Sequence, residues 1–245
     1  MNIISSLKIK EVELSKNANE LIKAIKSIKS FSCRTLRNIL YKHGYQCDYD
    51  PIAEYDTGIV ANLVQHFLDL IESPNNPLNS KSLERTAAVH TSIIIINRLF
   101  LSVNDIIELG WLEREYYATH KTKWDGVLFK VDDHKISPGF LEFSGGANNN
   151  TTITKERRDV KKLYSKMIDV MNQYSPKIRK KSFCIRFYEN TIFFEELSVY
   201  KKAMFRIQHV AITIPTTVRS LVKFADEIPK IIAWRNAVVK HVEQF

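Results

Sequence analysis

The chain has 245 residues, of which 44% are hydrophobic and 11% aromatic, and its formal net charge is +9 at pH 7. This length and composition predict a folded protein with one sizeable core and exclude a disordered polypeptide. The longest apolar run, residues 93–96, is followed at once by Asn97 and Arg98. Because a membrane-spanning helix needs about 20 apolar residues, we expect no membrane association.

The positive charge is concentrated in two blocks. Residues 1–47 carry nine Lys and Arg against three Glu, and residues 155–186 carry eleven Lys and Arg against three acidic residues. Such blocks favour a polyanionic partner such as nucleic acid, because each neutralised phosphate releases counterions. Lysine-rich helices that only face solvent have the same composition, so charge alone leaves both interpretations open.

Cysteine content and the N-terminal sequence favour an intracellular protein. The three cysteines are an odd number and include no CxxC pair, which suits a reducing compartment. Residues 1–20 contain neither the apolar segment nor the cleavage site of a standard signal peptide. We therefore expect a cytoplasmic or nuclear location.

The first half of the chain has a helical pattern. Apolar residues recur at helical spacing in residues 19–31 and again in residues 52–71. Lysines lie between the apolar residues of the first segment, so this basic amphipathic helix can pack on the protein's own core, which we favour, or bind a partner or a membrane. Residues 73–82, with two prolines and three asparagines, predict a loop. Residues 82–101 and 103–115 predict two more helices.

After Tyr117 the apolar pattern changes to the period of two that is typical of strands. It predicts strands at residues 124–131, 139–143, 182–188, 191–200 and 202–214. Residues 154–172 predict a helix between the second and third of these strands. A last helix begins at Thr216 or Thr217, with Pro229 as its break or kink. This order of elements predicts a mixed α/β fold in which helices cover one sheet.

Two acidic residues fall on neighbouring predicted strands. Asp125 begins the first strand, and Glu142 lies in the second between Leu141 and Phe143. A carboxylate on a buried strand is costly unless it is paired or bound to a metal, so Glu142 indicates either a functional site or an ion pair with an arginine. Asp125 with Gly126 is explained equally well as a turn dipeptide.

The predicted helix at residues 154–172 adds cations to this pair. It carries Lys155, Asp159 and Lys162, and the last two are one turn apart and can share a face. Cleavage of a phosphodiester needs carboxylates that hold Mg²⁺ or Mn²⁺ and a cation or base near the attacking water. Asp125, Glu142 and a helix lysine are residues of these types.

These residues resemble the motif of the PD-(D/E)XK nuclease-like superfamily, in which an Asp is followed after a gap by Glu-x-Lys. The chain is more closely similar to a group of fungal proteins with Asp, then Glu-x-Ser-Gly, then a helix with Asp-x-Lys-Lys-Leu. The matching positions are Asp125, residues 142–145 and residues 159–163. The resemblance implies a restriction-endonuclease-like mixed sheet flanked by helices in residues 51–245, with residues 1–50 as a basic helical extension.

The resemblance also implies a metal-dependent hydrolase that acts on nucleic acid. Asp125 and Glu142 would bind Mg²⁺ or Mn²⁺, and Glu54 would be the third carboxylate that this superfamily often takes from a preceding helix. Spacing does not choose between Glu54 and its alternatives Glu84 and Glu113.

The chain departs from the superfamily motif at Ser144, which stands where the motif has its lysine. Catalysis would then need a cation from the following helix, and Lys155 and Lys162 are the candidates. The alternative is a catalytically inactive nuclease-like fold that binds nucleic acid or protein. A third interpretation is an interaction protein that works through its basic N-terminal helix.

Overall fold

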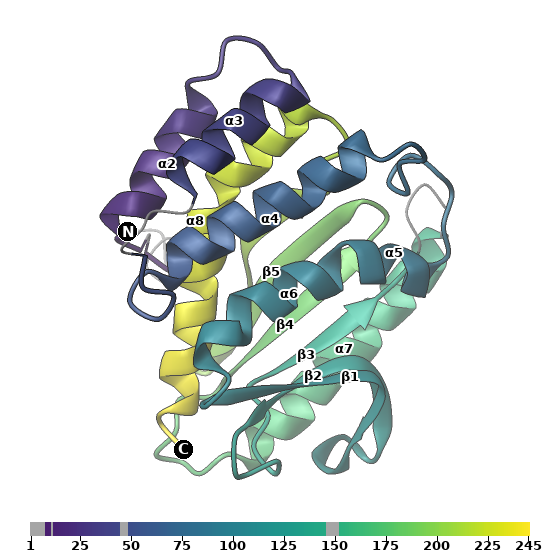
Figure 1. Cartoon of the computed structure of the whole chain (residues 1–245). Coiled ribbons are helices and arrows are strands. Elements are labelled where there is room, and N and C mark those ends of the chain that lie inside the picture. Colours follow the sequence, from purple (N-terminus) through teal and green to yellow (C-terminus); the bar gives the residue numbers. More distant parts are fainter. Residues whose placement is uncertain (1–7, 11, 45–48, 146–151) are drawn as a thin grey trace.

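A computed structural model describes residues 8–10, 12–44, 49–145 and 152–245. Six strands of this described part form one mixed sheet in the order β1-β2-β3-β4-β5-β6 (Figure 1). They are β1 (Ile107–Tyr116), β2 (Thr122–Lys130), β3 (Gly139–Phe143), β4 (Lys181–Tyr188), β5 (Thr191–Tyr200) and β6 (Ala203–Thr213). Strands β3 and β4 are parallel, and the other neighbouring pairs are antiparallel. The predicted mixed α/β fold is confirmed, as are the five predicted strands.

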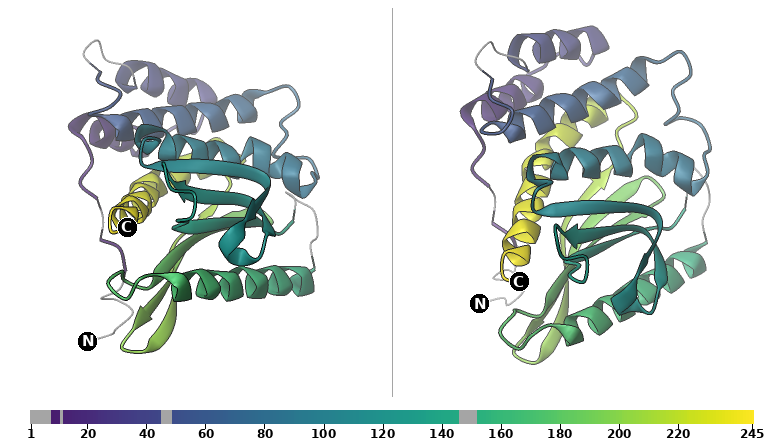
Figure 2. Two further views of the ribbon diagram at one scale, coloured as in Figure 1. Left: turned by 90° about the horizontal axis from the view of Figure 1, so that it is seen from below. Right: turned by 60° about the horizontal axis from the view of Figure 1, so that its bottom comes forward.

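Helices cover both faces of the sheet. Helix α7 (Ile153–Gln173) connects β3 to β4 and is the α-helix of the described residues that covers one face (Figures 1 and 2). Of the other described α-helices, four lie on the opposite side, and two more pack outside them. The four are α4 (Tyr55–Glu72), α5 (Glu84–His90), α6 (Ser92–Phe100) and α8 (Val218–Val242), and the outer two are α2 (Lys16–Lys26) and α3 (Cys33–His43).

The sheet separates two clusters of buried side chains. Successive residues of a strand point to opposite faces, so Leu141 and Phe183 enter the larger cluster with α4, α6 and α8. Phe140 and Cys184 enter the smaller cluster, where they pack against Leu163 and other residues of α7. The face of β3 and β4 that carries Phe140 and Cys184 is therefore the α7 face.

The basic N-terminal segment is packed into the larger cluster. Leu21 and Ile25 of α2 and Leu36 and Leu40 of α3 are buried there together with residues of α4 and α8. The prediction that the first basic helix packs on the protein's own core is confirmed. Helix α3, which the sequence did not predict, begins after Ser32, whose hydroxyl accepts a hydrogen bond from the backbone N–H of Thr35.

The prediction of a helix at residues 103–115 is wrong. After the short 3₁₀ helix η1 (Leu101–Val103), this segment forms the edge strand β1. Ile107, Leu109 and Trp111 pack against the core at a period of two, and the backbone pairs with β2. A register shift after Trp111, where Leu112 and Glu113 have φ of 53° and 56°, interrupts the alternation. The pattern that identifies a strand is therefore only five residues long.

One predicted helix is divided into two, and another continues where a break or kink was predicted. The helix predicted at residues 82–101 is divided at Thr91, which has φ −130° and ψ −90° and whose hydroxyl donates to the carbonyl of Ala87 at 2.6 Å. Helix α8, in contrast, continues through Pro229 without the predicted break. Buried residues on both sides of the proline, including Ile228 and Ile231, stabilise the helix against the cost of the proline.

In the described part of the chain, no single helix combines the length and the hydropathy of a membrane span. The bent pair made of α5 and Ser92–Val103 meets both criteria only when its two arms, 43° apart, are taken together.

Leu21→Ala should lower the free energy of unfolding by about 2–5 kcal/mol, because Leu21 is fully buried in the larger cluster. The control Lys23→Ala, on the exposed side of α2, should change it by less than about 0.5 kcal/mol. Denaturant unfolding followed by circular dichroism measures both values. Equal effects of the two substitutions would contradict the packing of α2 into the common core.

Candidate active site

Asp125 and Glu142 lie opposite each other on adjacent strands. The antiparallel pairing of β2 and β3 sets Gly126 opposite Leu141. The next position of the same register sets Asp125 opposite Glu142. Because Leu141 points into the larger core, Glu142 points to the α7 face. The structure thus brings together the two carboxylates that the sequence singled out.

The two carboxylates line a polar cavity of about 280 Å³ between the sheet, α5 and α7. The described lining also includes Glu84 from α5 and Lys155, Asp159 and Lys162 from α7. Acidic side chains and amino groups therefore face one another across a small volume. Both candidate lysines reach this cavity.

Lys162 is the lysine that contacts Glu142. Its Nζ donates to Oε1 and Oε2 of Glu142 at 3.0 and 3.2 Å. It also donates to the backbone carbonyl of Lys123 at 3.2 Å and lies 4.9 Å from the ring centroid of Trp124. These contacts hold the amino group where β2 and β3 meet. Of the two candidate lysines, Lys162 is therefore the one that lies beside Glu142.

Ser144 has a structural part in the strand pairing. It is only 5% exposed, and its backbone N–H donates to the carbonyl of Phe187 at 2.8 Å. This hydrogen bond continues the pairing of β3 with β4 beyond Phe143. Ser144 is not among the described residues that line the cavity.

Lys155 forms a second ion pair in the same cavity. Its Nζ donates to Oε2 of Glu84 at 2.6 Å, and the backbone N–H of Gly145 donates to the same oxygen at 2.9 Å. Burial acts to lower the pKa of Lys155, but the hydrogen bond and the charge of Glu84 outweigh it, so that pKa is raised. Glu84 therefore joins α5, the segment after β3 and the first turn of α7.

Glu84 and Asp159 lie near the pair, whereas Glu54 does not. Glu54 precedes α4, where both of its oxygens accept hydrogen bonds from Nδ2 of Asn17 at 2.8 Å, and it does not line the described cavity. Glu84 lies close enough to Asp125 for its charge to help raise the pKa of Asp125. Glu113 does line the cavity, but two neighbouring cations already pair with it.

Both carboxyl groups of the pair are difficult to ionise. Burial raises the pKa of Asp125 to about 6, against a hydrogen bond of 2.7 Å from the backbone N–H of Phe143. Burial also raises the pKa of Glu142 to about 7, although Lys162 acts to lower it, and the charge of Asp125 adds to the increase. The neighbouring groups therefore do not fully stabilise the two ionised carboxylates, and a further cation nearby would stabilise them.

The sequence also allowed Glu142 to form an ion pair with an arginine instead of belonging to a functional site. Arg186 is next to Glu142 in the register of β3 and β4. Its guanidinium instead donates to both oxygens of Glu195 at 3.1 Å and to Glu156 at 2.7 Å. Arg186 therefore belongs to a separate buried cluster, and Lys162 is the cation bonded to Glu142.

Asp125 and Glu142 have donors that suit a hard divalent cation. Among the described residues, no group of three or more His, Cys, Asp or Glu is arranged to hold a metal ion. Mg²⁺, however, usually keeps several waters and binds proteins through one or two carboxylates. A divalent cation would also favour the charged forms of two groups whose pKa is raised by burial. Asp125 and Glu142 are therefore the residues of this cavity that would hold such a cation.

Comparison of the chain with models of protein families, with curated proteins and with solved structures gives no match. The fold and site define a mixed α/β protein with an acidic pair and a lysine in a polar cavity.

Glu142→Gln should stabilise the protein more at pH 8 than at pH 5. The pKa of Glu142 increases from its ordinary 4.5 to about 7 on folding, so the folded state binds more protons between these values. The free energy of unfolding of the wild type then falls as pH rises through this window, by about 1–3 kcal/mol for this group. Because glutamine cannot ionise, the Glu142→Gln variant lacks this decrease in the free energy of unfolding. Denaturant unfolding of both proteins across this pH range measures the difference, and a difference that does not depend on pH would contradict the raised pKa.

Proposed function

We propose that this protein is a nuclease-like α/β protein that engages nucleic acid and hydrolyses phosphodiesters in this cavity with Mg²⁺ or Mn²⁺. The observation that carries the proposal is the amino group of Lys162, which donates to both oxygens of Glu142 beside Asp125. An acidic pair and a lysine are the residue types of the PD-(D/E)XK motif. In this chain the lysine comes from α7 and not from position 144.

The order of elements supports a restriction-endonuclease-like fold. Helices precede β1, β2 and β3, which are antiparallel neighbours, and α7 then leads to β4, which is parallel to β3. This is the order of helix, strands, helix and strand that the resemblance implies. The hairpin of β5 and β6 extends the sheet beyond that core.

Five residues of the cavity have a proposed part in hydrolysis. Asp125 and Glu142 would hold the divalent cation, which when bound would polarise a phosphoryl oxygen and lower the pKa of a water ligand. Lys162 keeps a positive charge where negative charge develops on the phosphate. The side chain of Lys162 is 36% exposed, so it can move between Glu142 and a substrate. Lys155 and Glu84 hold the start of α7 in place.

The second candidate function is a catalytically inactive nuclease-like fold that binds nucleic acid. One observation favours it: the amino group of Lys162 already occupies both oxygens of Glu142. The ion pair would then be structural, and binding would depend on the surface cations. Such binding should be sensitive to salt and should survive loss of the carboxylates.

Incubation with Mg²⁺ or Mn²⁺ should convert labelled single- or double-stranded DNA or RNA of mixed sequence into shorter products. Glu142→Gln and Lys162→Met should each lower the cleavage rate by about 100-fold or more, because each removes a charge from the site of reaction. The control Lys161→Met removes the same charge from the adjacent exposed position of α7 and should leave the rate unchanged.

Intact substrates under all of these conditions would contradict the catalytic proposal. Salt-sensitive binding of the same oligonucleotides, unchanged in Asp125→Asn and Glu142→Gln, would then establish the binding function. Cleavage that persists in Glu142→Gln would assign the activity to another site.

Addition of Mg²⁺ or Mn²⁺ should raise the melting temperature of the wild type and leave that of the Asp125→Asn/Glu142→Gln variant unchanged. The increase should be larger at pH 8 than at pH 5.5, because protons compete with the metal for carboxyl groups of pKa about 6 and about 7. Differential scanning fluorimetry measures both effects. Equal increases in the two proteins would place metal binding elsewhere.

A further inference from the structure

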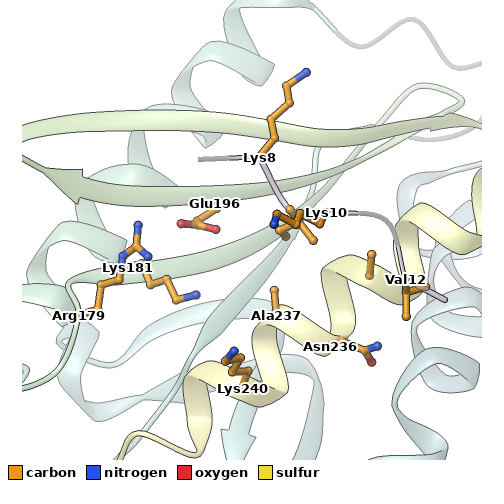
Figure 3. Close-up of a pocket in the computed structure, with 11 residues that line it drawn as sticks. Lys8, Lys10, Val12, Arg179, Lys181, Glu196, Asn236, Ala237 and Lys240 are labelled. Atoms are coloured by element: carbon orange, nitrogen blue, oxygen red, sulfur yellow. The ribbon is translucent and has the colours of Figure 1, made fainter. Parts of the chain in front are cut away.

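A second polar cavity lies at the other end of the sheet. Its volume is about 420 Å³, and residues 8–10 and 12, the start of β4 and helix α8 line it (Figure 3). Because β3 and β4 run in parallel, Glu142 near the end of β3 and Lys181 at the start of β4 lie at opposite ends of these strands. The described linings of the two cavities share no residue.

The lining of this second cavity is rich in cations. Among the described residues these are Lys8, Lys10, Arg179, Lys181 and Lys240. None of the five forms an ion pair with an acidic residue in the described part of the chain.

These cations come from segments far apart in the sequence. Lys8 and Lys10 belong to the first basic block, Arg179 and Lys181 belong to the second, and Lys240 lies near the end of α8. The fold therefore brings both basic blocks to one cavity. Lysine-rich helices that only face solvent would give no such convergence.

Three of the cations, Arg179, Lys181 and Lys240, are close enough for their charges to interact. Burial lowers the pKa of Lys181, and although the charge of Glu196 opposes this, the charges of Arg179 and Lys240 lower it further. A bound anion would relieve this repulsion. Lys181 is thus partly buried and has like charges around it.

Glu196, the acidic residue of the described lining, is engaged by a histidine. It is 5% exposed, and its Oε2 lies 3.3 Å from Nε2 of His209. The other ring nitrogen of His209 accepts a hydrogen bond from the backbone N–H of Ile9 at 3.4 Å. His209 therefore contacts Glu196 on one side and residue Ile9 of the N-terminal segment on the other, and so places that segment beside β6.

Small side chains provide the remaining wall. Ala233 and Ala237 are one turn apart on α8, and Val12 faces the same cavity. Figure 3 shows Arg179, Lys181 and Lys240 toward one end of the cavity, and Val12 and Asn236 toward the other. The site thus has a cationic end and a less polar end.

We propose that this cavity binds a small organic phosphate of nucleotide size. Its phosphate groups contact Arg179, Lys181 and Lys240, and its uncharged part contacts the wall formed by Val12, Ala233 and Ala237. Small-molecule sites have volumes of roughly 300–1,000 Å³, and this cavity lies within that range. A nucleic-acid backbone needs only exposed cations along a track, whereas a partly buried lysine and an apolar wall suit a ligand that enters the cavity.

Fluorescence anisotropy with N-methylanthraniloyl-ADP, measured on the full chain without divalent metal, tests this proposal. The probe should bind saturably to the wild type, and Lys181→Met and Lys240→Met should each weaken binding at least tenfold. The control Lys223→Met removes the same charge from another exposed position of α8 and should bind as the wild type does. Thermal melting of each variant verifies that it is folded.

Ala237→Leu separates binding within the cavity from general electrostatic attraction. The larger side chain occupies the cavity without a change of charge, so binding should again weaken at least tenfold. Absence of saturable binding, an equal loss in Lys223→Met, or wild-type affinity in folded Ala237→Leu would overturn the proposal. Displacement of the probe by an oligonucleotide but not by unlabelled ADP would also overturn it and identify a polymer as the ligand.

Discussion

The parallel pairing of β3 with β4 determines the arrangement of the rest of the structure. A parallel pair cannot be joined by a tight hairpin and needs a long crossover, which here is the 21-residue helix α7. The crossover lies on the face that carries Glu142, and so brings Lys162 to it. The same strand direction places the start of β4, with Lys181, at the opposite end from the end of β3. The direction of this one strand pair therefore explains why the two cavities lie at opposite ends of the sheet.

The buried carboxylates of the sheet differ in how well neighbouring groups stabilise their negative charge. Glu195 is fully buried, yet its pKa is lowered, because hydrogen bonds and charges from Arg186 and Arg206 outweigh the effect of burial. The pKa of Glu196 is also lowered against burial, chiefly by the nearby ring of His209. Glu142 differs, because a single partly exposed lysine leaves its pKa raised to about 7. Strong perturbation of this kind in a cavity is typical of functional sites, whereas the other two carboxylates are compensated as structural ion pairs are.

Local sequence pattern predicted much of the sheet but not the choice among site residues. The strands after Tyr117 have clear alternation and turn signals, and the pairing of Asp125 with Glu142 follows from two adjacent strands. The strand β1 was missed because its bulge leaves too short an alternation. Glu84 could not be preferred to Glu54 from spacing, since only the packing of α5 against the end of β3 decides between them. The second cavity joins residues 8–10 and 12 to residue 240, a contact that no local pattern contains.

Ser144 is compatible with a functional site for a reason that only the fold supplies. At this position the backbone still pairs with β4, and the side chain is buried, so a lysine here would have to bury its charge. Lys162 instead keeps part of its side chain in solvent, while the carbonyl of Lys123 and the ring of Trp124 hold its amino group near Glu142. The charge that the motif needs can thus come from the crossover helix. The relevant criterion for the proposed site is therefore the 3.0 Å separation of Nζ and Oε1, and not the residue found two positions after Glu142.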